Sequence, residues 1–114
     1  DKQVLKKHLQ EGKKIYGFWS EDKLTGYVFI IEYKKSLRIY SLAVMEEFRG
    51  QGIAHKLVEF VLGMAKKDEK SISLEVAESN KRAIRLYQSF GFKSVKLLPA
   101  YYKDGRNGVK MKLD

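Results

Sequence analysis

Hydrophobic residues along this chain recur at two different spacings, and the change from one spacing to the other marks the predicted elements. Apolar runs typical of a half-buried sheet predict strands at 15–19, 24–33 and 39–44. Short polar segments at 20–23 and 34–36 separate these strands and have the composition of turns. The three strands are therefore expected to form an antiparallel meander.

Apolar stripes at a spacing of three to four residues predict helices. The segment 52–66 carries a wide stripe, which indicates a helix lying against a sheet. The stripe consists of Ile53, Ala54, Leu57, Val58, Val61, Leu62, Met64 and Ala65. A second helix is predicted over 80–90, started by Asn80 and stopped by Gly91. Residues 1–11 are expected to form a further short helix with one apolar side and one lysine-rich side.

Alternation returns after the first long helix and predicts three more strands. The segment 71–77 places its large apolar residues on one face and Glu75 at the centre of the other. Strands around 92–98 and 109–113 close the chain. This order of elements predicts an α/β domain with a mixed sheet. No repeat or linker interrupts the pattern, so 1–114 is expected to be a single domain.

Composition narrows the class of protein. Hydrophobic residues make up 44% of the chain, which argues against disorder. The chain has no cysteine, so neither a disulfide scaffold nor a thiolate nucleophile is available. His8 and His55 are isolated and no carboxylates cluster, so no metal is expected. Without a run of membrane-spanning length or a signal-peptide pattern, we expect a soluble, cytoplasmic protein.

The net charge of +9 has two interpretations. One is a solvated, lysine-rich surface that keeps a small protein in solution. The other is attraction of an anionic partner, such as cofactor phosphates, a ribosome or an RNA surface. Basic residues are scattered and are paired only on short stretches such as Lys34-Lys35 and Lys66-Lys67, whereas a nucleic-acid face usually shows tighter clusters. Cofactor attraction and solubility are sufficient, and a nucleic-acid partner is not expected.

The turn between strand 39–44 and helix 52–66 has the sequence Arg49-Gly50-Gln51-Gly52-Ile53-Ala54. Unpaired N–H groups at a helix start form an anion site, and glycines let a phosphate approach the backbone without meeting a Cβ atom. Two glycines before a helix also fit a tight connection without a ligand. No Gly-Lys-Ser/Thr follows, so this is not a Walker P-loop, and the third glycine of a dinucleotide-binding fingerprint is absent.

Two motifs resemble the GNAT superfamily of N-acetyltransferases. Arg49-x-x-Gly52-x-Ala54 resembles its acetyl-CoA pyrophosphate loop, Gln/Arg-x-x-Gly-x-Gly/Ala. Residues 74–92 resemble its block Leu-Glu-Val-x-x-x-Asn-x-x-Ala-x-x-x-Tyr-x-x-x-Gly-Phe nearly residue for residue. The resemblance covers roughly residues 13–114 and is closest to the N-alpha-acetyltransferases that modify ribosomal-protein alanine.

The resemblance implies the GNAT fold, a mixed, mostly antiparallel sheet flanked by helices. The family's first strand and helix have no counterpart ahead of 1–11 and are expected to be missing. The resemblance also implies acetyl-CoA as cofactor, CoA as product, and direct transfer of the acetyl group to a primary amine. Proximity of two bound substrates suits a chain that has no cysteine.

The resemblance assigns the cofactor to three places. The pyrophosphate is expected on the amides of residues 50–55, and the pantetheine arm on Asn80. The thioester carbonyl is expected at a backbone N–H near the end of strand 39–44, where a bulge leaves amides unpaired. The implied cofactor-binding residues are Leu42, Ala43, Val44, Arg49, Gly50, Gln51, Gly52, Ile53, Ala54, His55, Asn80, Ala83 and Tyr87.

Two residues are candidates for acid–base catalysis. Glu75 is a carboxylate in the middle of an otherwise apolar strand, and burial would raise its pKa into the range useful for a general base. A half-exposed position or an ion pair with a nearby lysine would explain Glu75 as well. Tyr87 lies on nearly the same helical face as Asn80, where its phenol could protonate the departing CoA sulfur. A core tyrosine would have the same sequence.

Tyr101 and Tyr102 resemble paired tyrosines that line the acceptor site in the family, although a plain hairpin loop fits them equally. The expected acceptor is the α-amino group of a protein, either a ribosomal protein or a nascent chain, with ribosome association and no membrane contact. The alternatives are a lysine side chain, a small-molecule amine, a cofactor-binding module without turnover, and a basic RNA-binding domain.

Overall fold

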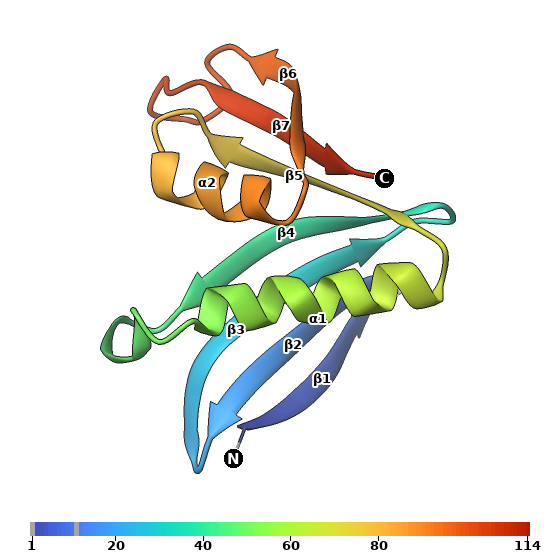
Figure 1. Cartoon of the computed structure of the whole chain (residues 1–114), viewed down its shortest axis with the longest axis vertical. Coiled ribbons are helices and arrows are strands. Elements are labelled where there is room, and N and C mark those ends of the chain that lie inside the picture. Colours follow the sequence, from blue (N-terminus) through green and yellow to red (C-terminus); the bar gives the residue numbers. More distant parts are fainter. Residues whose placement is uncertain (1, 11) are drawn as a thin grey trace.

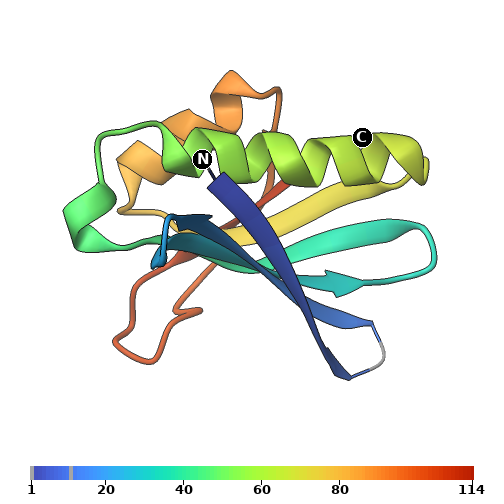
Figure 2. The same cartoon turned by 90° about the horizontal axis from the view of Figure 1, so that it is seen from below.

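Seven strands form one twisted sheet, and two α-helices lie on the same side of it (Figures 1 and 2). The computed structural model describes residues 2–10 and 12–114. The strands are β1 (Lys2–Gln10), β2 (Lys13–Ser20), β3 (Lys23–Glu32), β4 (Ser36–Val44), β5 (Ser71–Ala77), β6 (Lys93–Leu98) and β7 (Gly108–Leu113). The helices are α1 (Ile53–Lys67), α2 (Lys81–Ser89) and a short 3-10 helix, η1 (Glu46–Phe48).

The sheet is mixed, as the sequence predicts. Its strand order is β1-β2-β3-β4-β5-β7-β6, and β4 and β5 form its parallel pair within the described part of the chain. The predicted meander of β2, β3 and β4 is confirmed, as are both long helices and the three later strands. Asn80 caps α2 by accepting a hydrogen bond from the Ala83 amide, and Gly91 follows the helix at a φ of 99°.

The short helix predicted for residues 1–11 is wrong, because Lys2–Gln10 form strand β1. Residues 1 and 11 lie outside the described residues. β1 runs antiparallel to β2, with Val4 opposite Phe18, and Gly12 after it has the left-handed φ of 76°. An isolated helix of this length is marginal in water, whereas pairing with β2 satisfies the backbone groups of β1 that face β2.

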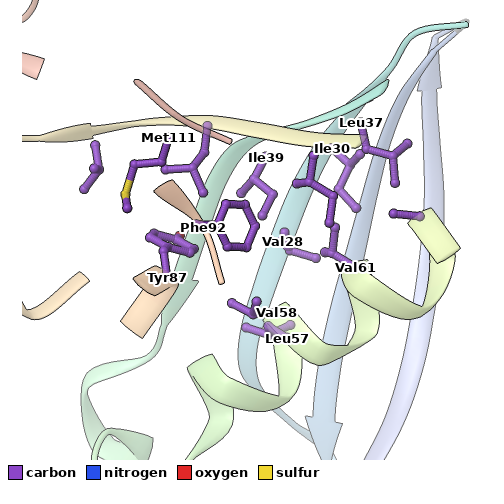
Figure 3. Close-up of a cluster of buried hydrophobic side chains, with 14 of the residues drawn as sticks. Val28, Ile30, Leu37, Ile39, Leu57, Val58, Val61, Tyr87, Phe92 and Met111 are labelled. Atoms are coloured by element: carbon purple, nitrogen blue, oxygen red, sulfur yellow. The ribbon is translucent and has the colours of Figure 1, made fainter. Parts of the chain in front are cut away.

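The hydrophobic core lies between the sheet and α1 (Figure 3). The buried residues of α1 are Ile53, Leu57, Val58, Val61 and Ala65, which belong to the predicted stripe. Gly26 on β3 lets the start of this helix approach the sheet. A Cβ atom there would lie 2.8 Å from the Ala43 carbonyl oxygen and 3.2 Å from Ile53 Cγ2.

The pairing of β4 with β5 ends halfway along both strands. Within the described chain the two strands pair from Ser36 opposite Ser71 to Ile39 opposite Leu74. Beyond that point β4 continues only against β3, and β5 continues only against β7. Tyr40 is an extra residue in β4 at this position, because Ile30 pairs with Ile39 and Phe29 pairs with Ser41. The two strands diverge from there, and α2 lies beside the opening (Figure 1).

Near the end of β4 and β5 where the two strands are paired, the Glu32 carboxylate connects β3 to β2 and to the residue before β5. Glu32 on β3 accepts hydrogen bonds from Lys14 Nζ on β2 at 2.8 Å and from Lys70 Nζ before β5 at 3.0 Å. These bonds lower the pKa of Glu32 from 4.5 to about 2.

We expect acid to weaken the fold through Glu32. A carboxyl whose folded pKa is depressed contributes stability above its unfolded pKa and loses that contribution as the pH falls through its folded pKa. The free energy of unfolding should therefore fall between pH 4.5 and about pH 2. Denaturant unfolding of wild type and Glu32→Gln at several pH values checks this. The variant should show a shallower decline over that window, and parallel curves would contradict the expectation.

Candidate active site

Two cavities open where β4 and β5 diverge. The first, of about 520 Å³, lies between the end of β4, the start of α1 and α2, and is called the α1 cavity below. It is lined by Leu42, Val44, Arg49, Gly50, Gly52, Ile53, Ala54, His55, Asn80, Arg82, Ala83, Leu86 and Tyr87. The second, of about 320 Å³, lies along the separated halves of β4 and β5 and is called the β5 cavity. It is lined by Ile39, Tyr40, Ser41, Leu42, Leu74, Glu75, Val76, Ala77, Asn80, Ala83, Tyr87, Tyr102 and Arg106.

Four residues line both cavities, namely Leu42, Asn80, Ala83 and Tyr87. Leu42 comes from β4, Asn80 caps α2, and Ala83 and Tyr87 come from the first and last turns of α2. The cavities therefore adjoin at the point where the strands separate. Two molecules bound in the two cavities would meet at this junction.

The α1 cavity has the features of an anion site. Gly50 and Gly52 adopt the left-handed φ values of 80° and 77°, and a Cβ atom on either would meet no other atom within 4 Å. The first helical hydrogen bond runs from the Lys56 N–H to the Gly52 carbonyl, so the N–H groups of residues 53–55 are not used within α1. No acidic residue occupies the first turn. The helix dipole and the side chains of Arg49 and Arg82 add positive potential.

Two backbone amides of β4 face the gap between the strands. The Met45 N–H donates to the Thr25 carbonyl on β3 at 2.8 Å. Because backbone groups alternate in direction along a strand, the N–H groups of Leu42 and Val44 point away from β3, toward the side that β5 has left. Both residues line the α1 cavity. They are donors of the kind that can polarise a carbonyl group.

The expected bulge is present, but not at the end of the strand. It lies at Tyr40, ahead of Leu42, because β4 changes register there to leave β5. The exposed donors near the strand end arise from the divergence of β4 and β5 instead. Ala43, which was expected to bind the cofactor, pairs with Tyr27 on β3 and lines neither cavity.

Tyr87 on α2 reaches the junction from within the core. The residue is 7% exposed, and its ring packs at 5.5 Å against the Phe92 ring (Figure 3). Burial raises the pKa of Tyr87 to about 12, so its phenol stays protonated under ordinary conditions. A protonated hydroxyl at the junction is suited to donate a proton.

Glu75 lies on the face of β5 opposite the core and lines the β5 cavity. Its side chain is 15% exposed and forms an ion pair with Arg38 on β4. The Arg38 guanidinium reaches Glu75 Oε1 with Nη2 at 2.7 Å and with Nε at 2.8 Å. An ion pair was one of the expected alternatives, but its cation is an arginine rather than a lysine.

The predicted acceptor tyrosines occupy different environments. Tyr102 lines the β5 cavity, and the Arg106 guanidinium lies 5.3 Å from its ring centre. Tyr101 lines neither cavity, is 45% exposed, and packs edge-on against Tyr102 at 5.0 Å. It also covers Gly108, where a Cβ atom would lie 3.1 Å from the Tyr101 ring. Tyr101 therefore supports Tyr102 rather than the cavity wall.

Two residues of the predicted loop have different positions. Gln51 is exposed and lines neither cavity. His55 lines the α1 cavity, and its ring packs at 4.5 Å against the Phe90 ring, which links the start of α1 to the end of α2. This ring contact between the two helices has no signal in the sequence.

Sequence reasoning missed several lining residues. Arg82 and Leu86 line the α1 cavity, and Tyr40 and Arg106 line the β5 cavity. Arg82 had a usable signal, because a basic residue in the first turn of α2 lies close to the Asn80 cap. Sequence reasoning also missed Arg38, the partner of Glu75. Arg38 had no usable signal, because Glu75 lies 37 positions later in the sequence.

The described part of the chain offers neither a cluster of metal ligands nor a membrane-spanning helix. No group of three or more histidine or acidic side chains could hold a metal ion there. In residues 2–10 and 12–114, neither helix has the length and apolar character needed to cross a membrane.

Comparison with known proteins decides the family. A family model described as an acetyltransferase (GNAT) domain matches residues 1–114. The chain belongs to the GNAT acetyltransferases. The GNAT resemblance and fold predicted from the two sequence motifs are thereby confirmed.

Individual GNAT relatives agree with this assignment. The N-alpha-acetyltransferase of Saccharolobus solfataricus is 44% identical over 75 residues, which are 64% of this chain and 45% of that protein. The crystal structure of the ribosomal-protein-S18-alanine N-acetyltransferase from Escherichia coli has a TM-score of 0.86 at 25% identity, over 91% of this chain and 70% of that one. The NatC complex bound to Gag peptide and CoA has a TM-score of 0.77 at 28% identity, over 87% and 69%. The chain spans about half the length of the first two curated relatives that it matches.

Proposed function

We propose that this chain is a single acetyltransferase domain that moves an acetyl group from acetyl-CoA directly to the α-amino group of a protein or peptide. The observation that carries the proposal is the junction of the two cavities at Leu42, Asn80, Ala83 and Tyr87. A two-substrate transfer needs two adjacent binding spaces with the catalytic groups between them.

The residues of the α1 cavity fit acetyl-CoA. Backbone N–H groups of residues 50–55, with Arg49 and Arg82 beside them, would hold its phosphates. Asn80 uses its Oδ1 atom to cap α2, which leaves its Nδ2 group for the pantetheine arm. The N–H groups of Leu42 and Val44 would polarise a thioester carbonyl. When bound, acetyl-CoA supplies an activated acetyl group.

Glu75 and Tyr87 have opposite roles in the proton transfers. Glu75 accepts the proton that the acceptor ammonium must lose, directly or through a water molecule. The freed amine forms a bond to the acetyl carbon as the carbon–sulfur bond breaks. Tyr87 donates its phenolic proton to the departing sulfur. The nitrogen loses a second proton to solvent as the amide forms, and solvent returns a proton to the Tyr87 phenolate.

The β5 cavity favours a peptide N-terminus as the acceptor. Tyr40 and Tyr102 give it aromatic walls, which can pack a first side chain and hydrogen-bond a peptide backbone. The related proteins include one named for a ribosomal-protein alanine and one bound to a peptide and CoA. Ribosomal proteins and nascent chains are the acceptors that we propose, and they would place the reaction in the cytoplasm.

Acetyl transfer to matched peptides tests this proposal. Each peptide is prepared with a free N-terminus and with an N-terminal formyl group, and each contains one internal lysine. We expect the free form to react at least about tenfold faster, because the acceptor site must hold an amine next to a peptide backbone. Equal rates would assign the enzyme to lysine side chains, and no transfer to any peptide would overturn the proposed acceptor.

A further inference from the structure

We propose that Arg38 is a positioning residue that orients the Glu75 carboxylate toward the acceptor. This inference rests on the proposed function, in which Glu75 is the general base. Arg38 itself cannot be the base, because a guanidinium stays protonated in proteins. Its proposed contribution is to fix the direction of the Glu75 carboxylate.

The geometry of the pair supports this role. The Nε hydrogen bond and the Nη2 salt-bridge contact of Arg38 reach the same atom, Oε1 of Glu75. Among the described residues no side chain donates to Oε2, which remains for a ligand in the β5 cavity. The Arg38 guanidinium also lies 5.6 Å from the centre of the Tyr40 ring, so it is restrained from a second direction. One oxygen of the base is thus fixed while the other is free to accept a proton.

The position of the pair in the sheet links it to the divergence of the strands. Arg38 lies opposite Ser73 within the paired part of β4 and β5, and Glu75 follows Leu74, the last residue of β5 that pairs with β4. The ion pair therefore spans the two strands where their backbone pairing ends. A residue of β5 beyond this point has no backbone partner on β4. The side-chain contact with Arg38 supplies a restraint that backbone hydrogen bonds between β4 and β5 no longer give.

Other charged and titratable groups also face Glu75. They are Lys110, opposite it on β7, Tyr102 and Arg106 from the segment between β6 and β7, and Tyr87 from α2. Among the described residues, Arg38 is the one that forms a salt bridge with Glu75. Removing Arg38 leaves the others in place, so its effect can be measured separately.

Two substitutions of Arg38 separate charge from direction. Arg38→Gln removes the cation and should lower kcat by about 10- to 100-fold. Arg38→Lys keeps the charge but not the two-point contact, so it should recover kcat only in part. The acceptor KM should change little in both variants.

Lys14→Gln is the matched control, because it breaks a comparably buried ion pair with Glu32 outside both cavities. It should leave kcat and the acceptor KM unchanged. A merely structural role for Arg38 would lower the melting temperature of Arg38→Gln without lowering kcat at a temperature where the variant is folded, and that result would overturn the proposal.

Glu75→Gln separates a failure of this inference from a failure of the proposed function. If Glu75→Gln keeps full activity, Glu75 is not the base and both assignments fall. If Glu75→Gln is inactive but Arg38→Gln matches wild type, only the role of Arg38 falls. The carbon NMR chemical shift of the Glu75 carboxyl group in the free protein, at one fixed pH, gives a readout without turnover. Identical shifts in wild type and Arg38→Gln would also overturn the proposal.

Discussion

Replacing Tyr87 with phenylalanine is expected to slow the single-turnover rate of acetyl transfer by about 10²–10⁴-fold, the range of a lost general acid. The substitution removes only a hydroxyl from a buried ring, so the core packing against Phe92 should persist. Affinity for CoA should remain close to that of wild type. Single-turnover measurements are needed because product release can limit the steady-state rate.

Tyr16→Phe is the matched control for this result. Tyr16 is also 7% exposed and its pKa is likewise raised mainly by burial, but it packs against Phe60 and lines neither cavity. We expect Tyr16→Phe to retain the wild-type rate. If Tyr87→Phe slows transfer by less than about threefold, general acid catalysis by this phenol is wrong, and proximity with backbone donors carries the reaction.

Gly52→Glu is expected to abolish detectable binding of acetyl-CoA. A side chain at φ 77° strains the backbone, and the open space beside Gly52 would receive a negative charge where the phosphates are proposed to bind. Isothermal titration calorimetry should show saturable binding by wild type and an affinity at least about 100-fold weaker in the variant.

The control for this experiment places the same charge elsewhere on the same helix. Gly63 is an exposed glycine of α1 with open space around it, and it lines neither cavity. Gly63→Glu should bind acetyl-CoA like wild type. Gly52→Ala keeps the strain without the charge, so its affinity should lie between the two. Unchanged binding by Gly52→Glu would place the phosphates away from this turn.

The sequence alone was sufficient for the elements whose packing follows from local pattern. The apolar stripe of α1 and the alternating apolar residues of β5 each identify one buried face. That face does not depend on which other elements pack against it. The α2 helix was bounded by its Asn80 cap and by Gly91, two local effects that need no tertiary contact. The local pattern of Lys2–Gln10 was not sufficient, because the conformation of this segment depends on pairing with β2.

The candidate site divides in the same way. The glycine turn and the block at 74–92 carried their identities in consecutive residues, so the sequence by itself determined the family and named Glu75, Asn80 and Tyr87. Only the tertiary structure decided where β4 leaves β5. That point depends on a register change at Tyr40 and on which neighbouring strand each backbone group hydrogen-bonds. The same divergence makes the two cavities adjoin and exposes amides of β4. It also brings Arg38 onto Glu75, since contacts between residues far apart in the chain are set by the packing of strands and not by local pattern.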